Sequence, residues 1–156
     1  MGRRVAIAGF IALLVLLGLL RETFFVNLNY ILHYKYFEPG AGYEGVLPVF
    51  APLEGFSYRT LYISKWFITL FFALLFWFIQ KKFLLFLFHE KKPVFWLGML
   101  YLSLLLLAGI SLGAGWLLGS LETGYRFSRI CMGLLQSPAP CMVIIPLTYF
   151  YKHNQL

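Results

Sequence analysis

The chain is dominated by four long apolar runs, at about residues 5–20, 61–80, 94–118 and 130–151. Short polar segments separate them. Wound as helices, the runs measure roughly 24 to 38 Å, close to the roughly 30 Å thickness of a bilayer's hydrocarbon core. The pattern predicts an all-α integral membrane helical bundle. We expect one membrane domain over residues 1–156, with four transmembrane helices.

The first apolar run follows Arg3 and Arg4, as the apolar segment of a secretory signal does. No small-residue cleavage site comes after it, because the next residues are Arg21, Glu22 and Thr23. We therefore expect an uncleaved signal anchor.

Residues 21–60 form the longest polar segment of the chain. Helix-breaking residues are concentrated in its second half, and tyrosines suited to the headgroup level accompany them. The breakers are Pro39, Gly40, Gly42, Gly45, Pro48, Pro52 and Gly55. This segment predicts an extracytoplasmic loop after the first span, with an aromatic-rich continuation of that span lying along the membrane surface.

Composition strengthens the membrane interpretation. The chain is 61% hydrophobic and only 12% charged, against about 25% charged residues in soluble domains. Its mean hydropathy is +0.79. A soluble protein this small could not bury so much apolar surface.

The net charge of +7 points to membrane lipids as partners. The basic residues flank the apolar runs, where they contact anionic headgroups. No basic face alternates with exposed aromatic residues, so we expect no nucleic-acid partner. The flanking residues are Arg3, Arg4, Lys81, Lys82, Lys91, Lys92 and Lys152. The positive-inside rule then predicts a multi-pass membrane protein with both termini cytoplasmic.

The third run carries a stripe of small residues, Ser111, Gly115 and Gly119, at helical spacing. Small residues let two helix backbones approach closely inside a membrane. Two interpretations stay open: packing against another span of the same chain, or a binding face for another membrane protein.

The fourth run is interrupted at about bilayer depth by Gln136 and Ser137, followed by Pro138 and Pro140. Prolines remove backbone donors, so nearby carbonyls should lose their helical partners. Such breaks persist only against protein or water. The segment is either a structural kink or a substrate or ion pocket.

Arginines lie just outside two of the runs. Arg126 and Arg129 precede the fourth, and Arg21 with Glu22 follows the first. If they meet on one membrane face, they could hold a phosphate, a lipid headgroup or a peptide carboxylate. The alternative is headgroup anchoring or an Arg–Glu pair within the protein.

The sequence contains little that indicates a catalytic site or a metal site. Cys131 and Cys141 lie roughly 15 Å apart along one helix, too far for a disulfide. Cys131 could be a nucleophile, but it needs a base. The histidines are scattered and lack metal-ligand spacing, so we expect no metal and no cofactor. They are His33, His89 and His153.

Three stretches, RETFFVNLNYILHYKYF (21–37), SKWFITLFF (64–72) and GYRFSRICMGLLQSP (124–138), carry a resemblance. They resemble small multi-span proteins encoded beside exosortases in Bacteroidetes-type bacteria, the exosortase-associated membrane proteins. The resemblance implies an inner-membrane accessory of a protein-sorting or surface-export system, without an established activity.

Exosortases themselves use a cysteine, an arginine and a histidine in that chain order, whereas here the arginines precede Cys131. We therefore expect a non-enzymatic accessory subunit that binds a membrane partner. The alternatives are a membrane-embedded cysteine transpeptidase or protease-like enzyme, and a small transporter or channel subunit.

Overall fold

The computed structural model describes residues 2–37 and 45–153. These residues form only helices, without a strand among them, which confirms the all-α class. In chain order the helices are α1 (Gly2–Phe37), the 3-10 helix η1 (Pro48–Gly55), α2 (Tyr58–Phe88), α3 (Lys92–Leu117), α4 (Leu121–Leu135) and α5 (Ala139–His153).

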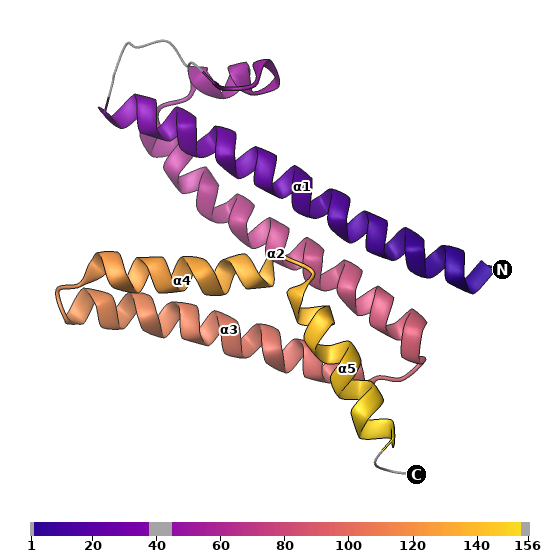
Figure 1. Cartoon of the computed structure of the whole chain (residues 1–156). Helices are drawn as coiled ribbons and strands as arrows, with labels where there is room; N and C mark the ends of the chain where they lie inside the picture. The colour runs from indigo at the N-terminus through magenta and orange to yellow at the C-terminus, as the bar shows by residue number, and fades with distance from the viewer. Residues whose placement is uncertain (1, 38–44, 154–156) are drawn as a thin grey trace.

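The helices form a membrane bundle. By length and composition, α1, α2 and α3 can each cross a bilayer. The shorter helices α4 and α5 meet at a 61° bend and together can form a fourth span. Figure 1 shows α1 running beside α2 and α4 running back along α3, while α5 turns away toward the end of the bundle where α3 begins.

Helix α1 is longer than the first apolar run. It continues without interruption through residues 21–37 and reaches 36 residues, so the helix does not end where the first apolar run ends. The physical reason is that no glycine or proline occurs between Gly18 and Pro39, and two charged residues do not end a helix. Residues 38–44, including Pro39, lie outside the described residues.

The C-terminal half of α1 packs into a small apolar cluster. Its buried members are Leu28, Ile31, Leu32 and Leu61, with side chains of η1 against them. Asn27 of α1 holds the residue just before η1 in place, because its Oδ1 accepts a hydrogen bond from the Leu47 backbone N–H at 2.8 Å. Residues 21–37 and η1 therefore form one packed unit.

The other boundaries also differ from the apolar runs. Helix α2 extends to Phe88 and ends at His89, which adopts a left-handed φ of 57°. Helix α4 begins at Leu121, so the predicted link over 119–129 is reduced to the turn at Gly119, whose φ is +69°. The predicted fourth span accordingly corresponds to two helices, α4 and α5, that meet at a bend, instead of one helix starting at residue 130.

Both described ends of the chain lie at the α2–α3 turn. Arg3 donates from Nη2 to the Leu87 carbonyl at 2.9 Å, and Lys152 pairs with Glu90 at 2.8 Å. Figure 1 shows the N-terminus and the end of α5 near this turn. The basic residues that flank the apolar runs therefore gather at one end of the bundle.

Candidate functional site

The break between α4 and α5 is held by hydrogen bonds from other helices. Tyr101 on α3 donates its hydroxyl to the Leu135 carbonyl at 2.8 Å. Gln80 on α2 donates Nε2 to the Ser137 carbonyl at 2.7 Å. The Ser137 hydroxyl donates to Leu134 at 2.8 Å. Carbonyls released by the missing helical turn thus find partners inside the protein, as membrane burial demands.

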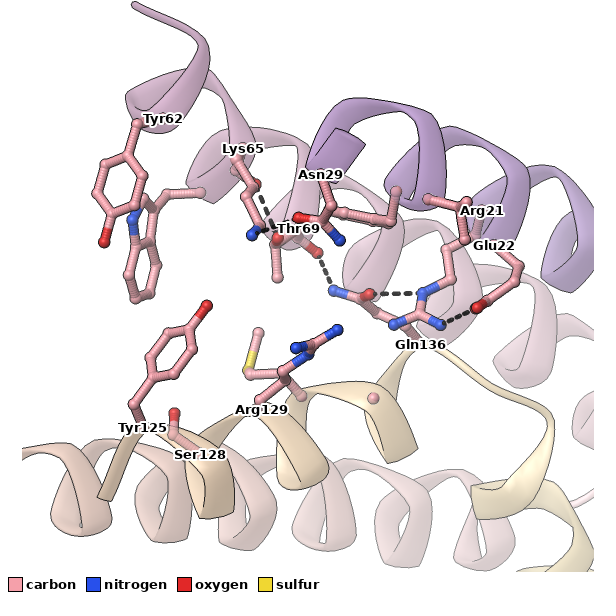
Figure 2. Close-up of a pocket in the computed structure, with 15 residues that line it drawn as sticks. Arg21, Glu22, Asn29, Tyr62, Lys65, Thr69, Tyr125, Ser128, Arg129 and Gln136 are labelled. Carbon is pink, nitrogen blue, oxygen red and sulfur yellow. Dashed lines mark hydrogen bonds and ion pairs between the residues drawn. The ribbon is translucent and has the colours of Figure 1, made fainter. Parts of the chain in front are cut away.

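Gln136 occupies the break itself and is only 2% exposed. Its Oε1 accepts a hydrogen bond from Arg21 Nε at 3.0 Å. Its Nε2 donates to the Thr69 carbonyl at 2.6 Å. Figure 2 shows the amide between the two helices that it bridges, α1 and α2. One side chain therefore ties the bend to both of the long helices.

A cavity of about 340 Å³ opens beside Gln136, between α1, α2 and α4. Three cationic side chains line it, one from each helix: Arg21, Lys65 and Arg129. Among the described residues that line it, the only carboxylate is Glu22. This space among membrane-crossing helices therefore carries a positive charge, and we refer to it as the cationic cavity.

The three cations differ in their partners. Arg21 pairs through Nη1 with Glu22 at 3.0 Å. Lys65 donates from Nζ to the neutral Asn29 Oδ1 at 2.8 Å. Within the described part of the chain, Arg129 makes neither a hydrogen bond nor an ion pair, and it lies close enough to Lys65 for the two to repel. Two positive charges of the cavity are therefore not neutralised by the residues that line it.

Hydroxyl groups and aromatic rings complete the cavity. Ser128 is 5% exposed, lines the cavity and makes no hydrogen bond to any described residue. In Figure 2 its hydroxyl points from α4 into the gap, and Tyr62 and Tyr125 face each other across that gap. The cavity therefore offers unused donors beside the charges.

The cavity lies away from the basic end of the bundle. Arg21 is roughly 26 Å along α1 from Arg4, and Lys65 is roughly 24 Å along α2 from Lys81. Both distances exceed half of a hydrocarbon core of about 30 Å. The cationic cavity therefore lies far along both long helices from the gathered basic residues.

The structure brings several of the predicted polar residues together. Arg21, Glu22, Arg129 and Gln136 all line the cationic cavity. Arg126 does not. It is exposed on α4, one turn from Arg129, and pairs with Glu122 at 2.6 Å, which matches the alternative of an internal Arg–Glu pair. Ser137 supports the bend without lining the cavity.

The small-residue stripe of α3 is covered by α4. A Cβ on Gly115 would meet the Cα of Gly124 at 2.9 Å, and a Cβ on Gly124 would meet the Ser111 carbonyl oxygen. Gly119 is not on this face, since it forms the turn after α3. Packing within the chain therefore accounts for the stripe, and the predicted partner-binding face at Ser111 and Gly115 is already occupied by α4.

The cysteine proposed as a nucleophile lacks catalytic surroundings. Cys131 is buried, with 3% exposure, and makes no hydrogen bond within the described residues. Two of the histidines make contacts elsewhere: the His33 ring lies tilted against Phe37 with ring centroids 4.8 Å apart, and His89 caps α2.

Lys65 and Ser128 are cavity residues that the sequence analysis did not identify. Lys65 could have been predicted from the sequence. It stands four residues before Thr69 in an otherwise apolar run, so the two polar residues share one face of the helix. Ser128 carried no signal, since one serine in an amphipathic segment is ordinary.

The chain matches no protein-family model, no curated protein and no solved structure. The three stretches 21–37, 64–72 and 124–138 nevertheless share one location: they contain every residue that lines the cationic cavity except Tyr62.

Proposed function

We propose that the protein is a non-enzymatic accessory protein of the bacterial inner membrane, whose cationic cavity binds the acidic group of a membrane-borne ligand. The observation that carries the proposal is the charge of the cavity. Arg21, Lys65 and Arg129 surround it, and Glu22 is the only carboxylate that lines it in the described part of the chain. Ionised residues among membrane helices are costly and are typical of ligand or ion sites.

The accessory role is supported by the resemblance to exosortase-associated proteins. The stretches that carry the resemblance are also those that line the cavity. Such an accessory serves a protein-sorting or surface-export system by holding an acidic ligand near its partner. The small-residue face of α3 is filled by α4, so contact with a partner falls on other surfaces.

The gathering of basic residues at one end of the bundle supports cytoplasmic termini. Anionic headgroups and the positive-inside rule favour that end on the cytoplasmic side. With this orientation the cationic cavity faces the outer leaflet, so its ligand enters from the extracytoplasmic half of the membrane.

Stabilisation by an anionic amphiphile tests the proposal. Adding dodecyl phosphate to the purified protein in neutral detergent is expected to raise the free energy of unfolding, because a ligand that binds only the folded state stabilises it. At a ligand concentration of 100 times Kd the gain is about 2.7 kcal/mol. The double variant Lys65→Gln/Arg129→Gln should lose most of this gain, as measured by thermal unfolding.

The matched control removes two charges elsewhere. Lys91→Gln/Arg126→Gln changes one lysine and one arginine outside the cationic cavity, and Arg126 lies on the same helix as Arg129. This variant should keep the full stabilisation. Equal stabilisation of the cavity variant and the wild type would refute an acidic ligand in the cavity.

A further inference from the structure

We infer that the acidic group is a phosphate bearing two negative charges, as on a phosphomonoester or a diphosphate. The inference rests on the proposed function and names the chemistry of its ligand. The charges of the lining residues come first. Arg21 and Glu22 pair with each other, which leaves Lys65 and Arg129. A phosphomonoester carries about −1.5 to −2 at pH 7, whereas a carboxylate or phosphodiester carries −1.

The two remaining cations also repel each other electrostatically. Lys65 and Arg129 come from different helices, α2 and α4, and repel across the cavity. In a membrane interior this repulsion is screened little. One monovalent anion would neutralise only half of the pair, and a divalent phosphate neutralises both. The charge balance therefore favours phosphate.

The available donors match a tetrahedral group. The guanidinium of Arg129 has a fork of N–H groups suited to two phosphate oxygens. Lys65 Nζ provides a point charge from the opposite wall, and the buried residue Ser128 adds a hydroxyl without a hydrogen-bond partner among the described residues. Figure 2 shows these three side chains pointing into the same gap from α2 and α4. Donors on two sides serve the several oxygens of a phosphate better than the two of a carboxylate.

The volume of the cavity leaves room beyond the phosphate. About 340 Å³ is at the small end of ligand pockets and exceeds what a bare phosphate fills. Tyr62 and Tyr125, both exposed, flank the gap, and tyrosine is typical of the headgroup level of membranes. The cavity would recognise the same phosphate group on a lipid and in free inorganic phosphate. The experiment below distinguishes these two sources of the ligand.

The experiment measures binding to the purified full chain at pH 8 by native mass spectrometry and by thermal unfolding. Four probes are compared: phosphatidic acid, phosphatidylglycerol, oleate and inorganic phosphate. We expect phosphatidic acid to bind about tenfold more tightly than phosphatidylglycerol or oleate, a ratio that corresponds to about 1.4 kcal/mol. Arg129→Gln should reduce this affinity about tenfold and Ser128→Ala about threefold, with Arg126→Gln within about twofold of wild type.

Each outcome has a defined meaning. Binding of inorganic phosphate as tight as that of phosphatidic acid supports the phosphate but assigns its source to solution, which overturns the membrane-borne ligand of the proposed function. Equal binding of phosphatidic acid, phosphatidylglycerol and oleate, all lost in Arg129→Gln, overturns the divalent phosphate but leaves the proposed function standing. Failure of all four probes to bind overturns both. If Arg129→Gln does not fold, Ser128→Ala decides between these outcomes.

Discussion

Replacing Gly124 by alanine is expected to produce the largest loss of stability among the single changes considered. The new Cβ would meet the Gly115 Cα at 2.9 Å and the Ser111 carbonyl oxygen still closer. Backbone atoms cannot rotate away, so α3 and α4 must separate. We expect a loss of about 3 kcal/mol, at the upper end of the range for overpacked interiors, measured by thermal or denaturant unfolding in detergent.

Gly113→Ala on α3 is the matched control. Nothing lies within 4 Å of a Cβ at Gly113, and alanine is the better helix former by about 1 kcal/mol. This variant should be as stable as wild type or slightly more stable. If the Gly124 and Gly113 variants unfold alike, the close approach of α3 and α4 is wrong.

The second large effect is expected at the break between the last two helices. Gln136→Leu removes the hydrogen bonds to Arg21 and Thr69 while keeping the size of the side chain. Interhelical hydrogen bonds in membranes average about 0.6 kcal/mol and reach about 1.7 kcal/mol. Two such bonds, one of them to a charged group, predict a loss of about 2 kcal/mol of unfolding free energy. Ligand affinity should fall with it, because Gln136 orients Arg21 at the cavity wall.

Ser103→Ala is the control for this change. Ser103 donates only to Leu100 of its own helix from an exposed position, so its loss should leave the unfolding free energy unchanged. A double-mutant cycle with Arg21→Gln isolates the pair. A coupling energy indistinguishable from zero between positions 21 and 136 would contradict the proposed role of the amide.

Hydrophobic patterning predicted the all-α membrane bundle because apolar runs of bilayer length are a strong signal. The ends of the helices were harder to predict from the sequence. The charged pair Arg21 and Glu22 suggested that the first span ended, although a helix ends where a breaker or a cap ends it. The bend after Leu135 was visible as Pro138 and Pro140, but its partners, Tyr101 and Gln80, belong to other helices and had no sequence signal.

The candidate site was predictable to the extent that its residues were conspicuous. Arginines beside apolar runs stand out, and the hypothesis that Arg21 and Arg129 share a site came from position alone. Which arginine faces inward depends on helix rotation. Arg126 and Arg129 are three residues apart, yet only Arg129 lines the cavity. Lys65 and Asn29 meet through the packing of α1 on α2, which no local pattern specifies.

Chemical labelling of a cysteine introduced into the lining of the cationic cavity tests most directly whether the cavity attracts anions. Tyr125→Cys places a thiol on the cavity lining, while Cys131 and Cys141 are both buried. We predict that a methanethiosulfonate bearing a sulfonate reacts about tenfold faster than one bearing a trimethylammonium group, after normalisation to a free thiol, because a preference of this size corresponds to about 1.4 kcal/mol. Adding Lys65→Gln/Arg129→Gln should abolish the preference. A trimethylammonium reagent that reacts as fast as the sulfonate would contradict a cationic cavity.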